Sequence, residues 1–275
     1  MAKTVLITGS SSGIGKSTVE YFLSKGWNVA ATMRTPEKAT GFPDHDKLRL
    51  YALDVTNQES IETSINKIIQ DFGDIDVVVN NAGYGAVGIF EKATAEEIQS
   101  QFNTNVFGVM NVIRAILPHF RGKKDGTIIN VTSMGGLITF PLYSVYHGTK
   151  WALEGFGESL HFELKQFNIK VKNVEPGAIK TDFYSRSMNV FTSDTIIDYD
   201  KYERTVFDNT QLVGQNAPGP EVVSKKIFKA ATDNTSRLRY VVGGQGPVLV
   251  FIRRMVPFSL FAMMVRMVAE KGFKK

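Results

Sequence analysis

Short apolar runs alternate with segments of helical spacing through the first two thirds of the chain. Such runs are apolar along nearly their whole length, as expected of strands buried on both faces of a sheet. Strands that alternate with helices indicate a parallel sheet covered on both sides. We therefore predict an α/β fold, a doubly wound parallel sheet with helices on both faces. The predicted strands are Thr4–Thr8, Trp27–Met33, Leu48–Leu53, Ile75–Val79, Thr127–Thr132 and Ile169–Glu175.

Capping residues and glycines mark where the helices begin and end. Gly26 is the predicted stop after a helix over Ile14–Lys25. Capping boxes at Thr56–Glu59 and Thr94–Glu97 open two more helices, the second a long one that runs toward Leu117. The remaining predicted elements are a helix over Tyr143–Gln166, a helix that begins near Pro220 and a last strand over Arg239–Val242.

The length and the hydrophobic content favour one domain. The chain has 275 residues, 43% of them hydrophobic, which is enough for a single large core. No linker or repeat divides it, so we predict one domain over residues 1–275. Residues 182–218 show no regular pattern, and a long irregular segment in a compact domain is often functional. We expect this segment to form a substrate lid.

Charge and cysteine content exclude several classes of function. The net charge is +5 and the pI is about 9.2, but the basic residues are scattered and no nucleic-acid motif is present. We therefore expect no nucleic-acid partner. The absence of cysteine excludes disulfides, thiolate catalysis and Cys-type zinc sites, and it fits a cytoplasmic location. The four histidines form no HExxH pattern, so no metal site is expected.

A glycine-rich turn follows the first strand and opens the first helix. Its sequence is Thr8–Gly15, with the spacing G-x-x-x-G-x-G. Glycines let the backbone approach a pyrophosphate closely, and the helix N-terminus offers free N–H groups and the positive end of the helix dipole. The position of the turn between a strand and a helix predicts a dinucleotide site.

The residue at the end of the second strand predicts the type of dinucleotide. Sites that prefer NAD usually place an acidic residue about twenty residues beyond the glycine turn, where it holds the ribose 2′-hydroxyl. Here the strand ends in Met33 and Arg34, without an acid. A guanidinium can bind a 2′-phosphate through two parallel hydrogen bonds. We predict NADP as the cofactor, with NAD as the alternative.

A tyrosine and a lysine one helical turn apart suggest acid–base chemistry. Tyr146 and Lys150 are at positions i and i+4 of a predicted helix, and therefore on one face. A phenol is a poor base near neutral pH, because its ordinary pKa is about 10. A nearby ammonium favours the phenolate, and the phenol can then exchange a proton with a carbonyl or alcohol oxygen.

Several motifs occur together in a fixed order. After the glycine turn come Asn80–Gly83 behind the fourth strand, Ser133 behind the fifth, the Tyr146/Lys150 pair and Pro176–Gly177 behind the sixth. This set resembles the short-chain dehydrogenase/reductase family in its single-domain form, over residues 3–181. The resemblance implies a Rossmann-like fold and hydride transfer between a nicotinamide cofactor and a small-molecule carbonyl or alcohol. It also implies a homodimer or homotetramer.

The resemblance also implies roles for individual residues. Tyr146 would be the general acid/base, and Lys150 would lower its pKa and hold the nicotinamide ribose. Ser133 would bind the substrate oxygen, and Asn105 would continue a proton relay through water. Asp54 would contact the adenine and Thr181 the nicotinamide carboxamide. The full set of expected cofactor contacts is Gly9, Ser11, Ser12, Gly13, Ile14, Gly15, Arg34, Asp54, Val55, Asn81, Ala82, Gly83, Tyr146, Lys150, Pro176, Gly177, Ile179 and Thr181.

Apolar residues near the catalytic positions predict an apolar substrate without identifying it. Steroid, retinoid, fatty and xenobiotic carbonyl compounds all fit this description. Alternative functions are a dinucleotide-binding regulator without turnover, a sugar-nucleotide epimerase or dehydratase, and a retinoid or steroid dehydrogenase at a membrane surface. The residues expected around the substrate are Gly135, Leu137, Phe140, Leu142, Tyr143, Phe183, Tyr184 and Met188.

The C-terminal segment, residues 248–275, is apolar enough to suggest a membrane. Arg253 and Arg254 lie inside the run, and Pro257 divides it into two short pieces. Each such charge costs about 2.5–3.5 kcal/mol at a bilayer centre, so we expect no transmembrane span. An interfacial position remains as an alternative. We expect the aromatic and methionine side chains of this segment to cover the substrate lid or a subunit contact: Phe251, Phe258, Phe261 and Met264.

Overall fold

A seven-stranded parallel sheet forms the centre of the computed structural model, which describes residues 2–181, 188–215 and 217–273. The strands lie in the order β3-β2-β1-β4-β6-β7-β9, and every neighbouring pair is parallel. The predicted α/β fold is confirmed. The strands are β1 (Thr4–Ile7), β2 (Asn28–Met33), β3 (Leu48–Ala52), β4 (Val77–Asn80), β6 (Gly126–Val131), β7 (Ile169–Pro176) and β9 (Arg239–Val242).

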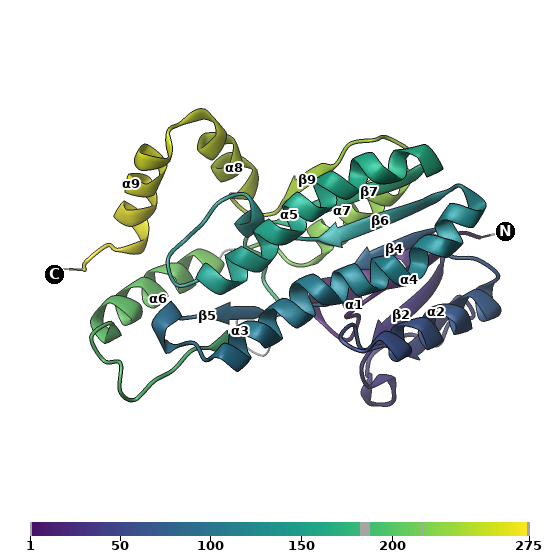
Figure 1. Ribbon diagram of the computed structural model, residues 1–275, viewed down its shortest axis with the longest axis horizontal. Coiled ribbons are helices and arrows are strands. Elements are labelled where there is room, and N and C mark those ends of the chain that lie inside the picture. The colour runs from purple at the N-terminus through teal and green to yellow at the C-terminus, as the bar shows by residue number, and fades with distance from the viewer. Residues whose placement is uncertain (1, 182–187, 216, 274–275) are drawn as a thin grey trace.

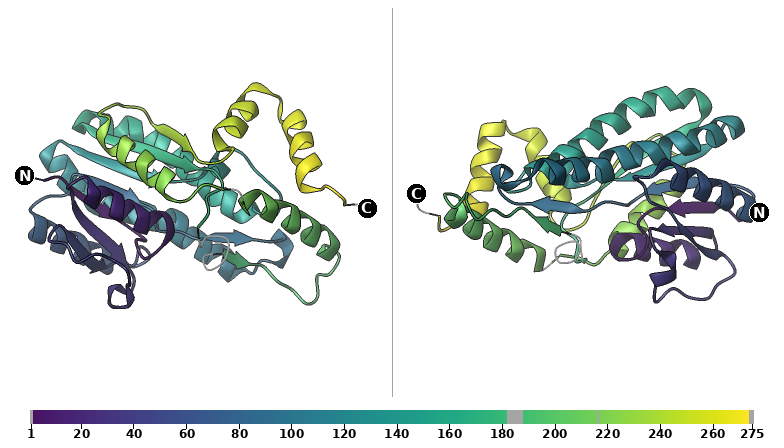
Figure 2. Two further views of the ribbon diagram at one scale, coloured as in Figure 1. Left: turned by 180° about the vertical axis from the view of Figure 1, so that it is seen from behind. Right: turned by 60° about the horizontal axis from the view of Figure 1, so that its bottom comes forward.

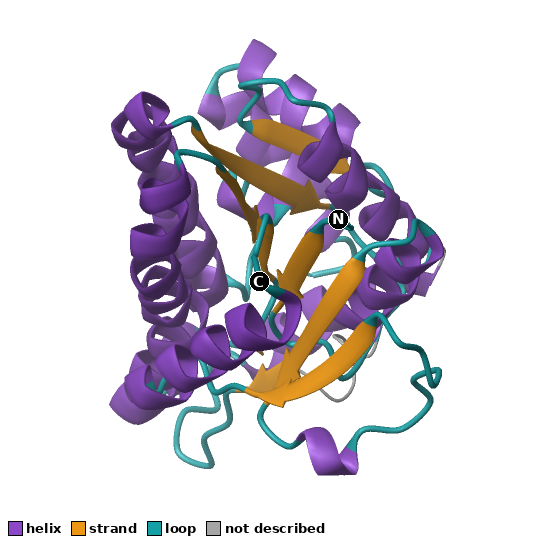
Figure 3. Ribbon diagram, turned by 90° about the vertical axis from the view of Figure 1, so that its right-hand side faces the viewer, coloured by secondary structure: helices purple, strands orange, loops and turns teal. Residues whose placement is uncertain are grey.

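Helices cover both faces of this sheet (Figures 2 and 3). The helices α1 and α7 pack on one face, and Val19, Phe22 and Ile227 are fully buried there. The other face carries α2, α4 and α5, with Ile61 and Val112 in its core. The two cores explain why the strands are apolar on both sides. The bounds are α1 (Gly13–Ser24), α2 (Gln58–Phe72), α4 (Gly108–Lys123), α5 (Ser144–Leu164) and α7 (Glu221–Thr232).

The strand order reverses between β1 and β4. Successive strands run outward from β1 to β3 on one side and from β4 to β9 on the other. The connections after β1 and β4 therefore leave the sheet in opposite directions and open a crevice at the carboxyl ends of these strands. Open α/β sheets bind their ligands at such a point.

One predicted helix start and one predicted helix length need correction. The first residue of the Thr56–Glu59 box is not the cap of α2; Asn57 is, and its side chain accepts from the Ser60 N–H at 2.9 Å. The box at Thr94 is confirmed, since Thr94 and Glu97 bond reciprocally. The long helix predicted from it is three pieces: α3 (Ala95–Phe102), a π-helical turn (Asn103–Phe107) and α4.

The segment predicted as an irregular lid contains regular structure. A short strand, β8 (Met188–Val190), pairs in parallel with β5 (Gly85–Val87), and α6 (Asp200–Gln215) follows. The prediction missed this helix because its composition is polar overall, although Tyr202, Val206 and Phe207 recur at helical spacing on its buried side. Residues 182–187, with Phe183 and Tyr184, lie outside the described residues.

The C-terminal segment forms a helical hairpin that projects from one end of the molecule (Figure 1). Its arms are α8 (Gly246–Met255) and α9 (Phe258–Ala269), and Pro257 lies at the corner. Within the described residues, no helix has the length and apolar character needed to cross a membrane. Of the side chains expected to cover the lid, Phe261 is buried, whereas Phe251 and Phe258 are exposed.

Candidate active site

One cavity of about 1170 Å³ occupies the crevice at the carboxyl ends of the strands. It is lined by residues from the glycine turn, from the ends of β2, β4, β6 and β7, from α5 and from the C-terminal hairpin. Most of the predicted site residues therefore meet around one space, although they are spread over nearly the whole sequence. The cavity is large enough for a dinucleotide and a second molecule, since small-molecule sites usually measure about 300–1,000 Å³.

The glycine turn is tied directly to the loop after β4. The Thr8 hydroxyl oxygen accepts from the backbone N–H groups of Asn81 and Ala82, both at 3.0 Å. The Asn81 side-chain amide donates in return to the carbonyls of Thr8 and Gly9. A Cβ on Gly9 would lie 2.7 Å from the Ala82 Cα, and Gly9 has a φ of +66°. Only glycine fits between the two loops.

The N-terminus of α1 is open toward the cavity. Ser12 is the N-cap residue, but its side chain makes no capping hydrogen bond, and the first turn contains no acidic residue. Ser11, Ser12, Gly13 and Ile14 line the cavity. The free N–H groups and the helix dipole therefore suit the pyrophosphate of a dinucleotide.

Gly15, predicted as a cofactor contact, does not line the cavity. A Cβ at this position would lie 2.2 Å from the Gly9 carbonyl oxygen and 2.6 Å from the Asn81 side chain. Gly15 therefore allows α1 to pack against the turn, which is a structural requirement of the same motif. The pattern of glycines alone does not separate the two roles.

The far end of the cavity fits the adenosine part of a cofactor. Arg34 is exposed at the end of β2 and lines the cavity, as do Asp54 and Val55 after β3. One Asp54 carboxylate oxygen accepts from the backbone N–H and the hydroxyl of Thr56, at 2.9 and 2.7 Å. These bonds hold the loop after β3 in a fixed turn beside the cavity.

Ser133, Tyr146 and Lys150 lie together at the other end. Ser133 follows β6, and its Oγ accepts from the Gly135 N–H at 3.0 Å. Tyr146 and Lys150 are one turn apart on α5, with the Lys150 Nζ 5.7 Å from the centre of the Tyr146 ring. The Lys150 Nζ donates to the Val131 carbonyl at 3.1 Å. Burial lowers the pKa of Lys150 to about 8, and the Glu154 carboxylate opposes this shift.

Asn105 lies behind the cavity rather than in its lining. It is in the π-helical turn, and its Oδ1 accepts from the Tyr84 N–H at 3.1 Å. Its Nδ2 donates to the Tyr84 carbonyl and to the Thr149 hydroxyl. The Thr149 hydroxyl in turn donates to the Tyr146 carbonyl at 2.7 Å. The side chain of Asn105 is thus connected to the backbone of the helix that carries Tyr146.

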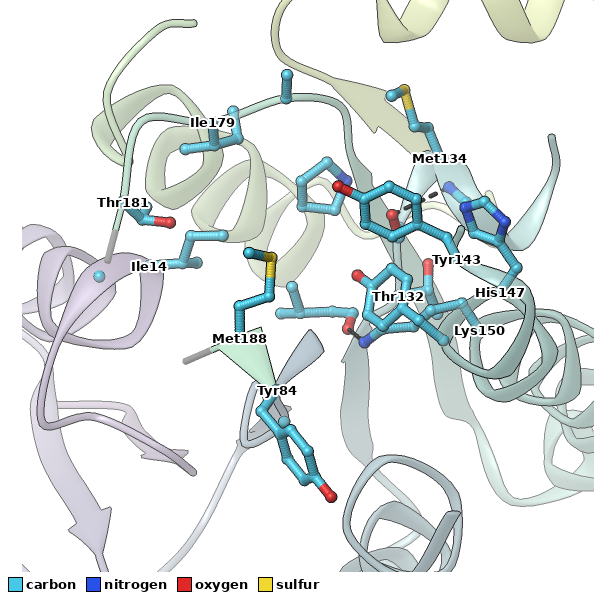
Figure 4. A pocket seen from close by; sticks show the side chains of 18 of the residues that line it. Ile14, Tyr84, Thr132, Met134, Tyr143, His147, Lys150, Ile179, Thr181 and Met188 are labelled. Atoms are coloured by element: carbon cyan, nitrogen blue, oxygen red, sulfur yellow. Dashed lines mark hydrogen bonds between the residues drawn. The ribbon is translucent and has the colours of Figure 1, made fainter. Parts of the chain in front are cut away.

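The side of the cavity opposite α5 is formed by the segment after β7 (Figure 4). There, Ile179 and Thr181 face the side chains of Tyr143, His147 and Lys150 across the cavity. Pro176, the last residue of β7, and Gly177, the first residue of the segment, also line the cavity. Every predicted contact after β7 therefore reaches the cavity.

The part of the cavity beyond Ser133 is mainly apolar. Gly135, Phe140, Tyr143 and Met188 line it as predicted, but Leu137 and Leu142 do not. Leu142 is instead buried in a small cluster with Val87 and Val206. The C-terminal hairpin completes this part of the lining with Leu249, Phe261, Met264, Val265, Val268 and Ala269.

His147 is a cavity residue that the motifs do not mark. It is buried, its ring stacks on Tyr143 with centres 5.6 Å apart, and its Nδ1 accepts from the Phe140 N–H at 3.4 Å. Burial lowers the pKa of His147 to about 4, so its ring is neutral at pH 7. The sequence carries no clear signal for this residue, because adjacent residues of a helix do not lie on the same face.

A comparison with family models matches residues 3–189 to the short-chain dehydrogenase model. The chain belongs to the short-chain dehydrogenase/reductase family. The uncharacterized oxidoreductase YusZ of Bacillus subtilis is 37% identical over 94% of this chain and 95% of its own length. Bovine retinol dehydrogenase 8 is 34% identical over 93% of this chain and 86% of its own length. The protein is therefore an oxidoreductase that acts on CH–OH groups.

Solved structures support the same family. A short-chain dehydrogenase from Streptomyces avermitilis has a TM-score of 0.80 and 32% identity, with 97% of each chain covered. The structure of ElxO with NADP bound has a TM-score of 0.76 and 29% identity, and covers 90% of this chain and 100% of that one. The cofactor of this short-chain dehydrogenase/reductase is a nicotinamide dinucleotide.

Proposed function

We propose that this protein interconverts an apolar ketone or aldehyde with the corresponding alcohol, using NADP(H). The observation that carries the proposal is that Ser133, Tyr146 and Lys150 line one cavity with the open N-terminus of α1. Three regions of the cavity fit the successive parts of a dinucleotide. They are the end of the cavity at Arg34, the glycine turn and the segment after β7. When bound, the nicotinamide supplies or accepts a hydride at the substrate carbon.

The residues of the chain supply the proton and the oxyanion stabilisation. In the reduction, Ser133 and Tyr146 donate hydrogen bonds to the carbonyl oxygen, and Tyr146 then gives up its proton. The Lys150 ammonium beside the phenol stabilises the phenolate that forms. In the oxidation, the same phenolate takes the proton of the alcohol. Asn105 acts through Thr149 on the backbone of the helix turn that carries Tyr146. The relay through water that the family resemblance assigns to Asn105 would restore the proton of the phenol.

The preference for NADP is proposed from the end of β2. Arg34 is exposed beside the cavity, and β2 ends without an acidic residue. A guanidinium at this position attracts a 2′-phosphate, whereas an acid would repel it. Structural relatives bind either NADP or NAD, so the assignment rests on Arg34.

The apolar substrate is proposed from the lining beyond Ser133. Phe140, Met188 and Phe261 contribute hydrophobic surface there, together with the inner side of α9. An apolar lining with a few polar groups at the reacting end selects for hydrophobic compounds with one polar group. The bovine relative is a retinol dehydrogenase, which supports an apolar alcohol or carbonyl compound as substrate.

A panel of carbonyl compounds and alcohols tests the proposal. Purified protein is assayed with NADPH or NADH on linear aldehydes of increasing chain length, on cyclic and polycyclic ketones, and on short sugars as polar controls. We expect kcat/KM to increase with apolar size and to be higher with NADPH. Turnover of polar sugars alone, or dinucleotide binding without turnover of any compound, would contradict the proposed function.

A further inference from the structure

A row of buried polar side chains crosses the sheet beneath the cavity. Asn80, Asn130 and Asn173 occupy paired positions on β4, β6 and β7. The Asn80 amide donates to Asn130 at 3.0 Å, and the Asn130 amide donates to Asn173 at 3.2 Å. The Asn173 amide then donates to Glu154 of α5 at 3.1 Å. The row therefore ends on a buried carboxylate.

The Glu154 carboxylate accepts hydrogen bonds from three side chains, which belong to three separate parts of the sheet. The Thr132 hydroxyl donates to its Oε1 at 2.6 Å, and Asn173 and the Arg239 Nε donate to its Oε2. The residue is only 3% exposed. Charge-assisted bonds of this kind stabilise the ionised carboxylate. Glu154 therefore links the end of β6, the middle of β7 and the edge strand β9 to helix α5.

The carboxylate is next to two residues of the proposed reaction. Glu154 is one helical turn beyond Lys150 on α5. Its donor Thr132 directly precedes Ser133. A Cβ on Gly136 would lie 2.8 Å from the Glu154 Cγ, so the 3₁₀ turn that starts after Ser133 packs directly on the glutamate. The turn after Ser133 is thus packed on Glu154, and Lys150 is one helical turn before it on α5.

The charged groups around Glu154 come from four elements. Arg239 of β9 also bonds Glu158 on the exposed face of α5. Glu175 of β7 is fully buried, and burial and the charge of Glu154 raise its pKa to about 9. Glu175 is therefore neutral at pH 7. Its carboxyl lies 3.8 Å from Arg239 and is also influenced by Arg254 of α8. Glu154 is the acidic residue whose charge raises the pKa of Lys150, against the effect of burial.

We propose that Glu154 is a positioning residue of this active site. Its carboxylate stabilises the ammonium form of Lys150, and through Thr132 it fixes the end of β6 that carries Ser133. The inference rests on the proposed function, because it assigns Glu154 to the chemistry of Ser133, Tyr146 and Lys150. The buried row of asparagines and Arg239 hold the glutamate itself in place.

The test measures the protonation of Lys150 without any substrate. The full-length protein is labelled with ¹³C and ¹⁵N lysine, and the Lys150 signal is identified by its loss in Lys150→Met. The pKa of Lys150 is then measured by NMR in the wild type, Glu154→Gln, Glu154→Asp and Glu158→Gln. Glu158→Gln is the matched control, because it removes the other carboxylate that bonds Arg239.

We expect Glu154→Gln to lower the pKa of Lys150 by about one unit, since a nearby opposite charge shifts a pKa by about 1–3 units. Glu154→Asp keeps the charge and should stay close to the wild type, as should Glu158→Gln. In the assay, kcat of Glu154→Gln at pH 8 should fall about fivefold, because a decrease of one unit from a pKa of about 8 lowers the ammonium fraction of Lys150 at pH 8 by about this factor. KM for the cofactor should change less than kcat.

An unchanged pKa of Lys150 in Glu154→Gln, or an equal shift in Glu158→Gln, would overturn the proposal. If Glu154→Gln does not fold, Thr132→Val tests the second role, because it removes the short bond between the end of β6 and the carboxylate, together with the longer contact of the same hydroxyl with the Val174 carbonyl. This variant should lower kcat and leave the pKa of Lys150 in place; an unchanged kcat would refute the role. The NMR result is independent of the substrate, so it separates a failure of this inference from a failure of the proposed function.

Discussion

Lys150 is the residue at which the proposed chemistry and the stability of the fold conflict. Its ammonium is buried, and burial lowers its pKa from the ordinary 10.5 to about 8. The unfolded chain therefore binds this proton more tightly than the folded protein. The penalty is fully present below pH 8 and disappears as the pH rises from about 8 to 10.5. A shift of this size corresponds to about 3 kcal/mol.

Replacement of Lys150 by methionine should consequently stabilise the fold while it removes activity. We expect the free energy of unfolding at pH 7 to rise by about 1–3 kcal/mol, because the buried charge is lost together with one hydrogen bond to the Val131 carbonyl. The measurement is urea unfolding of both proteins at pH 7 and at pH 10. The difference in the free energy of unfolding between the two proteins should be smaller at pH 10, because Lys150 of the folded wild type is then largely neutral. A variant that is less stable than the wild type at pH 7 would contradict the charge assignment.

Arg34 is the residue at which the cofactor preference can be reversed. It is exposed, so its replacement should not disturb the core. A charge-assisted pair contributes about 1.5–3 kcal/mol, or about ten- to a hundredfold in affinity. Arg34→Asp should therefore lower kcat/KM for NADPH by about this factor and raise the value for NADH. The measurement is kcat/KM with both cofactors; a wild type that favours NADH would reject the assignment.

At the scale of elements, the first turn of the helix α6 is bonded to a buried cation, Lys92. The Lys92 Nζ donates to Asp200 at 2.8 Å and to Glu203 at 2.7 Å, and both acids are in the first turn of α6. These two bonds raise the pKa of Lys92. Asn209 and Thr210 of the same helix line the cavity. The position of α6, and with it part of the substrate lining, depends on this contact.

Lys92→Met should loosen α6 without affecting the cofactor part of the site. We expect KM for the substrate to rise roughly three- to tenfold, because part of the lining is no longer held, with little change in the dissociation constant of the cofactor. Lys225→Met, on the exposed side of α7, is the control. Equal KM values in the wild type and Lys92→Met would show that this ion pair does not position the lining.

The elements also show which structural features are predictable from sequence. The strands and most helices follow from apolar runs and caps, which are local signals. The π-helical turn does not, because it depends on bonds of Asn105 to Tyr84 and Thr149, which are distant in sequence. The helix α4 extends past Pro118 to Lys123, since the buried Phe120 secures its last turn. Contacts between residues that are distant in sequence leave no periodic pattern in the sequence, so neither feature could be predicted.

At the scale of the whole molecule, segments near both ends of the sequence line the same cavity, the glycine turn near the N-terminus and α9 near the C-terminus. The motifs locate its cofactor part, because loops at strand ends carry recognisable residues. They do not locate the contribution of α9, whose residues line the cavity only through tertiary packing. Asn209 of α6 donates to the carbonyls of Ala269 and Lys271, and Tyr202 bonds Glu270. The C-terminal hairpin is thereby attached to α6.

Deletion of residues 248–275 should for this reason affect the substrate and not the cofactor. The truncated protein loses the hairpin side of the cavity, and α6 loses its partner. We expect KM for an apolar substrate to rise at least about tenfold, or the oligomer to become smaller, with an unchanged dissociation constant for NADPH. Kinetics, cofactor titration and light scattering measure these quantities. An unchanged KM together with an unchanged oligomer size would contradict the prediction, as would recovery in the membrane fraction that depends on this segment.

The central claim is that Tyr146 supplies the proton of a carbonyl reduction in this cavity. The most direct test compares kcat of the wild type and Tyr146→Phe on the best carbonyl substrate, with the NADPH dissociation constant measured in parallel. Removal of the phenolic hydroxyl should reduce kcat by roughly 10²–10⁴-fold, the usual contribution of a positioned general acid, and should leave NADPH binding nearly unchanged. A Tyr146→Phe protein that retains the full kcat would contradict the proposed mechanism.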